Sequence, residues 1–138
     1  MKIKEVMTKN IKSVTPQSGI DEAAKIMEND DTGFVPVVTD GILCGVITDR
    51  DIALRCVAQN TNPQKLAAKD IMSTRVVHIS PDNSVTEAAR LMAKEQIRRL
   101  PVCEEGKLVG VITLGDISRS KNYFSETAAA FCDISKPE

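Results

Sequence analysis

The chain has 138 residues, of which 42% are hydrophobic and 27% charged, and its formal net charge is −1. This length suits one ordinary domain or two very small ones, and the near-neutral charge excludes the basic field that draws proteins to nucleic acid or anionic membranes. Only 3% of the residues are aromatic, and no apolar run has the length of a signal peptide or a membrane span, so we expect a soluble, cytoplasmic protein with no nucleic-acid or membrane partner.

The chain is a tandem duplication. The segment from Lys4 to Ile52 aligns without a gap with the segment from Lys69 to Ile117. The matches run through a shared Glu-Ala-Ala, a Pro-Val pair and the endings GVITDRD and GVITLGD. Two copies are too few for an extended array, so a closed pair of repeats is favoured.

Each copy predicts a strand and then a helix. Residues 11–14, and 76–79 in the second copy, form a short apolar strand that ends at a Ser/Thr-Pro step. The next segment has apolar residues at i, i+3, i+4 and i+7, which is typical of an amphipathic helix. These positions are Ile20, Ala23, Ala24 and Met27 in the first copy and Val85, Ala88, Ala89 and Met92 in the second.

A hairpin and a second helix complete each copy, which gives the order β-α-β-β-α. Asp40-Gly41 joins the apolar runs 34–38 and 42–47, and Asp-Gly between apolar runs is a strong hairpin signal. The second copy repeats this pattern with the runs 100–103 and 108–112. The last helix begins near Asp49 in one copy and near Gly115 in the other.

The hairpin strands are apolar at nearly every position, which is typical of strands buried on both faces. Two helices cover only one face of a small sheet. We therefore expect an α+β fold in which the two β-α-β-β-α repeats pack sheet-to-sheet with pseudo-two-fold symmetry and the helices lie outside. The predicted organisation is repeat 1 at 1–60, a linker at 61–68, repeat 2 at 69–121 and a C-terminal tail at 122–138, with a short helix at 127–132.

The cysteines predict no metal site. Cys44, Cys56, Cys103 and Cys132 form no CxxC pair, and His78 is the only histidine in the sequence. Cys44 and Cys103 each stand where the sister copy has valine, which favours buried thiols that act as small apolar side chains. Nothing in the sequence constrains Cys56 or Cys132.

The repeated Thr-x-x-Asp, Thr48 to Asp51 and Thr113 to Asp116, has two readings. In the structural reading it is a capping box, in which Thr caps a helix and Asp reaches back to the Thr amide. A cap alone would not require the glycine that precedes it in GVIT. In the functional reading, a strand that ends at a helix N-terminus presents free amides, and an Asp there accepts two hydrogen bonds from a ribose diol. The spacing alone leaves both readings open.

The repeat order, the ending G-V-I-T-x-x-D-I and the preceding L/V-P-V resemble the CBS domain, present as a tandem pair (a Bateman module) over about residues 4–120. The resemblance implies clefts between the two repeats that bind an adenine nucleotide (AMP, ADP or ATP) or S-adenosylmethionine as a regulatory ligand, with no obligatory cofactor. Carried over to this sequence, it implies ligand contacts by Thr48, Asp51, Thr113 and Asp116.

Four further residues are candidates for the nucleotide site. Arg98 and Arg99 directly precede a buried strand, and they either clamp a phosphate, which a guanidinium matches well, or pair with acids on the surface. Arg50 stands where the second copy has Gly115, and it either points to solvent or reaches a phosphate. His78 is either a packed or edge residue or a neighbour of the ligand, since its strand borders the nucleotide in CBS pairs.

The sequence holds no Ser/His/Asp set, Cys/His pair or P-loop, so we expect no enzymatic activity. The prediction is a stand-alone regulatory module that binds an adenosyl ligand and signals its occupancy by a conformational change. One alternative is an interaction subunit whose degenerate clefts bind no ligand and which docks on an unidentified protein partner. Another is a redox or metal sensor that uses the cysteines. The outer helices, with their small alanine side chains, predict a homodimer.

Overall fold

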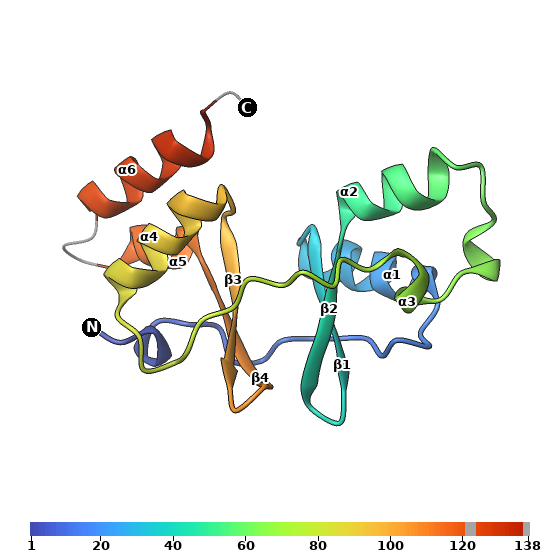
Figure 1. Cartoon of the computed structure of the whole chain (residues 1–138), viewed down its shortest axis with the longest axis horizontal. Helices are drawn as coiled ribbons and strands as arrows, with labels where there is room; N and C mark the ends of the chain where they lie inside the picture. The colour runs from blue at the N-terminus through green and yellow to red at the C-terminus, as the bar shows by residue number, and fades with distance from the viewer. Residues whose placement is uncertain (121–123, 137–138) are drawn as a thin grey trace. The chain divides into compact units, whose positions relative to one another are not determined.

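The computed structural model describes residues 1–120 and 124–136, and the chain divides into two compact units (Figure 1). Unit 1 contains Met1–Ile11 and Val77–Glu138, and unit 2 contains Lys12–Val76. The units therefore group the chain differently from the sequence repeats, because the N-terminal segment belongs to the unit of the second repeat. Within the described residues, no helix combines the length and the apolar character that crossing a bilayer requires.

Unit 2 is built around one hairpin. Its elements are α1 (Ile20–Asp30), β1 (Phe34–Thr39), β2 (Ile42–Thr48), α2 (Asp49–Ile52), the π-helical turn η2 (Ala53–Val57), η3 (Pro63–Lys65) and α3 (Ala68–Ile71). β1 and β2 pair antiparallel. Their two-residue turn has positive φ at both Asp40 (51°) and Gly41 (84°), as Asp-Gly predicts.

Unit 1 repeats this plan. Its elements are η1 (Ile3–Glu5), α4 (Val85–Glu95), β3 (Arg99–Glu104), β4 (Lys107–Thr113), α5 (Leu114–Arg119) and α6 (Phe124–Ile134). β3 and β4 pair antiparallel, and the register shifts at Val102, as it shifts at the sister residue Val37 in β1. The predicted element order and α+β class are thus confirmed, except that the first strand of each copy is reduced to a single parallel bridge residue, Val14 or Ile79.

The hairpin of each unit is crossed by a segment that precedes the other sequence repeat's helix: the segment around Thr8 crosses the hairpin of unit 1, and the segment around Ser73 crosses that of unit 2. In unit 1, the Thr8 amide donates to the Val111 carbonyl at 2.9 Å and the Val111 amide donates to the Thr8 carbonyl at 3.0 Å. In unit 2, Val46 and Ser73 exchange the same two hydrogen bonds at 3.0 and 2.8 Å. The N-terminal segment and the segment after α3 therefore have equivalent structural roles.

These crossings explain the glycine of GVIT. A Cβ on Gly110 would stand 2.8 Å from the Thr8 carbonyl oxygen and 2.7 Å from the Met7 sulfur. A Cβ on Gly45 would stand 2.8 Å from the Ser73 carbonyl oxygen and from the sulfur of Met72, the sister of Met7. Each glycine is therefore required by the close approach of a neighbouring backbone.

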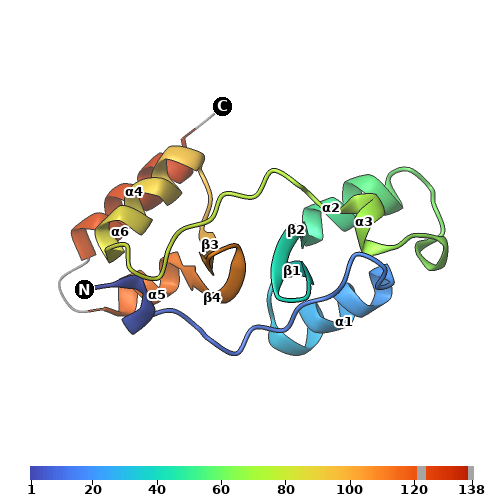
Figure 2. The ribbon, with the colours of Figure 1, turned by 60° about the horizontal axis from the view of Figure 1, so that its bottom comes forward.

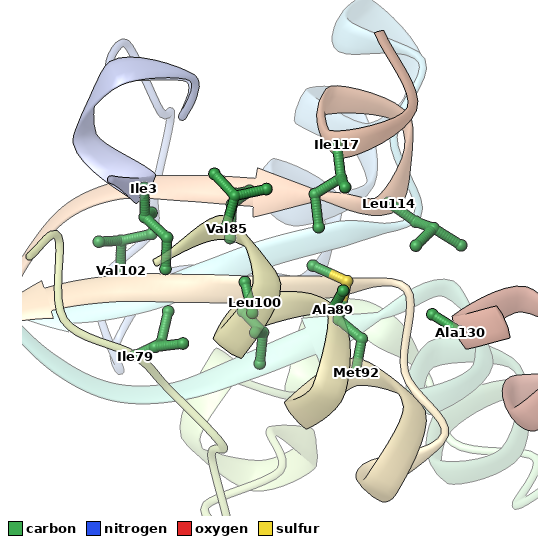
Figure 3. Close-up of a cluster of buried hydrophobic side chains, with 12 residues drawn as sticks. Ile3, Ile79, Val85, Ala89, Met92, Leu100, Val102, Leu114, Ile117 and Ala130 are labelled. Carbon is green, nitrogen blue, oxygen red and sulfur yellow. The ribbon is translucent and has the colours of Figure 1, made fainter. Parts of the chain in front are cut away.

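Each unit has its own hydrophobic core. The core of unit 1 contains fully buried residues from η1, α4, β3, β4 and α5 (Figure 3), among them Ile3, Val85, Met92, Leu100, Ile112 and Ile117. The core of unit 2 contains the sister residues of Val85, Leu100 and Ile112, which are Ile20, Val35 and Ile47, and it also contains Ile71.

The C-terminal helix α6 belongs to unit 1 and is longer than the predicted 127–132. It packs against α4 and α5 and lies beside them in both views (Figures 1 and 2). Ala130 of α6 is only 2% exposed and joins the core of unit 1. Ala89 on α4 is 3% exposed, whereas its sister Ala24 on α1 is exposed. A helix of the same chain thus already covers the surface of α4 that was expected to receive a helix from another copy.

Two cysteines are buried, but they are not the two that the sequence favoured. Cys103 is buried as predicted, and its desolvation raises the pKa of the thiol. Cys44 is only half-buried, because its Sγ lies beside Thr39 Oγ1 near the turn of the hairpin. Cys56, which the sequence left unconstrained, is 1% exposed because η2 continues the helix begun by α2 and turns this side chain inward.

Candidate ligand site

Both Thr-x-x-Asp segments form capping boxes. In unit 1, Thr113 Oγ1 accepts from the Asp116 amide at 3.0 Å, and Asp116 Oδ2 accepts from the Thr113 amide at 2.9 Å. In unit 2, Thr48 and Asp51 form the same pair of hydrogen bonds at 3.1 and 2.9 Å. The structural reading of the motif is therefore confirmed for both copies.

Capping uses only one carboxylate oxygen, and the other oxygen meets an arginine that the sequence analysis did not single out. Asp116 Oδ1 accepts from Arg119 Nη2 at 2.7 Å. Arg119 is 73% exposed, whereas the Asp116 side chain is only 9% exposed, so the guanidinium is the mobile partner of this ion pair and the one that a ligand would displace. Oδ1 is thus the atom of Asp116 that is left to accept from a ligand.

The second carboxylate oxygen of Asp51 has two neighbours instead of one, both at longer distances. Asp51 Oδ1 accepts from Ser73 Oγ at 3.3 Å and lies 3.8 Å from Arg55 Nε. Arg55 also donates through Nη1 to the carbonyls of Ile71 and Met72, which fixes its side chain. The capping carboxylate of unit 2 is therefore tied to the segment that crosses its own hairpin.

Unit 1 contains a cleft of about 390 Å³ at the junction of β3, β4, α5 and α6. It brings together three residues that the sequence predicted as ligand contacts, Arg98, Arg99 and Thr113. The backbone fixes this arrangement, because the Leu114 amide donates to the Arg98 carbonyl at 2.8 Å. The remaining lining residues are Leu114, Gly115, Ser118, Thr127 and Phe131.

Two of these lining residues, Thr127 and Phe131, lie on α6 and were missed by sequence reasoning. The Arg98 guanidinium carbon lies 6.0 Å from the centre of the Phe131 ring, within the range of a cation–π contact. The only sequence signal was an apolar run in the tail, and the tail has no sister segment that would have marked it as part of a site.

At the sister positions, unit 2 has different charges. Gly33 replaces Arg98, and Asp49 replaces Leu114. The Asp49 carboxylate lies over Gly33, since a Cβ added to that glycine would stand 2.8 Å from Asp49 Oδ2. Asp49 also accepts from the amide of Arg50, whose side chain is exposed. The corner that holds two guanidinium groups in unit 1 thus holds one carboxylate, Asp49, and one exposed guanidinium, Arg50, in unit 2.

The other predicted contacts are not among the residues that line this cleft. Thr48, Arg50 and Asp51 lie in unit 2. His78 lies in unit 1 and is exposed. Asp116 is connected to the cleft through its two hydrogen bonds with Thr113.

Comparisons with known proteins agree with this architecture. The chain is 40% identical over 133 residues to the CBS domain-containing protein YhcV of Bacillus subtilis (strain 168), covering 96% of this chain and 94% of YhcV. The solved CBS domain pair of protein MJ0100 in complex with 5′-methylthioadenosine and S-adenosyl-L-methionine is 33% identical, with a TM-score of 0.75 and coverage of 86% of this chain and 98% of that one. The structure of CBSX2 in complex with AMP is 27% identical, with a TM-score of 0.73 and coverage of 86% and 93%.

A family model for the CBS domain matches the chain twice, at residues 3–57 and 68–122. These matches cover most of the sequence and both copies of the duplication. The chain therefore belongs to the CBS-domain family and carries two CBS domains in tandem.

Proposed function

We propose that the protein is a regulatory module that binds an adenine nucleotide and signals its occupancy by a change of conformation, without a catalytic step. The observation that carries this proposal is the cleft of unit 1, where two guanidinium groups lie together with the hydroxyl of a capping threonine. The AMP and S-adenosyl-L-methionine complexes of similar CBS pairs support an adenosyl ligand.

Each lining group has a role in this proposal. Arg98 and Arg99 bind the phosphate, because the planar guanidinium fork matches phosphate oxygens in a bidentate manner. Thr113 Oγ1 accepts from the Asp116 amide, and its own proton is available for a ribose oxygen. Asp116 Oδ1 accepts from the ribose diol once Arg119 moves aside.

The charged side chains favour a phosphorylated ligand, and they favour its binding in the cleft of unit 1. Arg98 and Arg99 both line the cleft of unit 1, whereas the corresponding corner of unit 2 has Arg50 as a cation and Asp49, whose negative charge opposes a phosphate. We therefore expect AMP, ADP or ATP to bind more tightly than adenosine or S-adenosylmethionine.

Calorimetric titration with AMP and adenosine tests the proposal. Arg98→Ala should weaken AMP at least tenfold and leave adenosine unchanged, because only the phosphate contact is removed. Arg90→Ala, which removes an exposed cation of α4 that does not line the cleft, is the matched control and should change neither ligand. Absence of AMP binding by the parent protein, or equal AMP affinities for all variants, would refute the assignment.

Asp116→Asn separates capping from ligand binding. The asparagine oxygen can still accept from the Thr113 amide, so the loss of stability should be at most about 1 kcal/mol. The second, charged acceptor is lost, and hydrogen bonds to charged groups contribute about 1.5–3 kcal/mol, so AMP and adenosine should both weaken at least tenfold. An unchanged affinity would leave the motif as a helix cap alone.

The alternative, a protein-docking subunit, is favoured by the exposed apolar residues of unit 2. Leu54 and Val57 on η2 are 46% and 70% exposed.

A second proposal concerns the assembly of the protein. Ala24 on α1 is exposed as well, and we propose that Ala24, Leu54 and Val57 of unit 2 contact a second copy of the chain in a homodimer. Light scattering at micromolar concentration should give about twice the chain mass of 15.0 kDa, and a value near 15.0 kDa would refute the dimer.

A further inference from the structure

We propose that the C-terminal helix α6 forms the base-binding wall of the cleft in unit 1, with Phe131 as the surface on which the adenine stacks. This inference rests on the proposed function, because it assumes that the cleft takes an adenine nucleotide. It adds an element outside both CBS repeats to the site and names the residue that contacts the base.

The position of α6 is fixed by the core of unit 1. Ala130, next to Phe131 in the chain, is 2% exposed and packs in the cluster that also holds Leu114 of α5 and Met92 of α4 (Figure 3). One turn further along the helix, Gln96 Nε2 donates to the Asp133 carbonyl at 3.3 Å. Because these contacts lie on both sides of Phe131 in the sequence, the ring is held beside the cleft.

The chemistry of the lining matches the two ends of a nucleotide. Phe131 is 52% exposed, which is unusual for an aromatic side chain and leaves ring surface open to a ligand. Bases stack on aromatic side chains because every base has a π-face. The Arg98 guanidinium lies over one face of the same ring, so a phosphate held by it brings the rest of the ligand toward Phe131, whose exposed surface is left for the base.

The cleft is also of suitable size. Its volume of about 390 Å³ is within the range of pockets for small ligands, about 300–1,000 Å³. Gly115 contributes no side chain to the floor, where the first repeat has Arg50. This part of the cleft, beside Thr113, is therefore free of a large side chain and can take a ribose.

This arrangement predicts one nucleotide site per chain. The tail after Ser120 has no sister segment in the first repeat, so unit 2 has no counterpart of α6. Unit 2 also has Gly33 and Asp49 where unit 1 has Arg98 and Leu114. A titration with AMP should accordingly saturate at one ligand per chain.

Three probes separate the two ends of the site: AMP, adenosine and ribose 5-phosphate. Phe131→Leu keeps the apolar bulk but removes the π-face, so it should weaken AMP and adenosine at least tenfold and leave ribose 5-phosphate unchanged. Arg98→Ala should show the converse, weakening AMP and ribose 5-phosphate but not adenosine. Phe131→Tyr restores the ring and should bind AMP like the parent protein. Cys132→Ala, at the exposed neighbouring position on α6, is the matched control.

The outcomes distinguish this inference from the proposed function. If Phe131→Leu binds AMP like the parent while Arg98→Ala weakens it, the nucleotide site stands and the role of α6 is wrong. If Phe131→Leu weakens ribose 5-phosphate as much as AMP, Phe131 only positions Arg98 and does not stack on a base. Tighter AMP binding by Phe131→Leu would mean that the ring competes with the ligand for Arg98, which also overturns the inference. If the parent binds no AMP, the proposed function fails and the inference fails with it.

Discussion

Replacing Gly110 by alanine tests the structural account of the GVIT motif. The added Cβ would stand 2.8 Å from the Thr8 carbonyl oxygen, closer than real Cβ atoms approach a backbone oxygen. The Thr8 backbone cannot move away without lengthening the two hydrogen bonds, 2.9 and 3.0 Å long, that join it to Val111. The Met7 sulfur, at 2.7 Å from the same Cβ, would have to move as well.

The expected cost follows from these contacts. Losing both backbone hydrogen bonds costs about 1–3 kcal/mol, at about 0.5–1.5 kcal/mol each. Replacing a glycine within a strand returns about 0.5–1 kcal/mol of backbone entropy. The difference is about 0–2.5 kcal/mol, and displacement of the Met7 sulfur adds to it, so Gly110→Ala should lower both the free energy of unfolding and the Tm.

Urea unfolding, followed by far-ultraviolet circular dichroism, measures this change directly. The matched control is Gly115→Ala, which makes the same substitution five residues later. There the new Cβ meets only the flexible end of Arg119 at 3.3 Å and Thr113 Oγ1 at 3.5 Å, and alanine favours the helix by up to about 1 kcal/mol. We expect Gly115→Ala to be neutral or stabilising. If Gly110→Ala is as stable as Gly115→Ala, the close approach of Thr8 does not explain the glycine.

Two further measurements test individual contacts. Hydrogen bonding and charge from Lys4, with a smaller effect of Lys2, lower the pKa of Asp82 below 3.8. The contribution of Asp82 to stability is therefore present above its unfolded pKa and is lost as the pH falls through its folded pKa. An NMR titration should show a pKa below 3.8, and Lys4→Met should raise this pKa toward 3.8. Ala89→Leu should destabilise the protein by about 1–3 kcal/mol because α6 packs against α4, whereas Ala24→Leu at the exposed sister position should change stability by less than about 0.5 kcal/mol. Equal effects of the two leucine variants would contradict the packing of α6 described above.

Features governed by local chemistry could be predicted from the sequence. The Asp40-Gly41 turn, the amphipathic helix α1 and the capping box of Thr113 depend on residues within a few positions of one another. The duplication strengthened each prediction, because every element was read twice. The resemblance to the CBS family singled out Arg98, Arg99 and Thr113 as ligand contacts, but the sequence left open which Thr-x-x-Asp copy lies beside the two arginines.

Features governed by distant contacts could not be predicted. Thr8 pairs with Val111 across most of the chain, and no local pattern marks that pairing. Phe131 comes from a segment that has no sister, so the repeat gave no indication that it lines the cleft. The arginine partner of Asp116 was hidden for another reason: Arg119 lies three residues away, but surface ion pairs at such spacing are too common to identify one in advance.

The placement of Met1–Ile11 in unit 1 has a consequence for biosynthesis. Unit 2 is one continuous segment, Lys12–Val76, and it is complete soon after residue 76 leaves the ribosome. The N-terminal segment is made first, but its partner Val111 is among the last residues of the second repeat. Closing so long a loop slows folding, because its entropy is lost before the contact is gained. The segment Met1–Ile11 is thus synthesised before unit 2 but reaches its native position after unit 2 has folded.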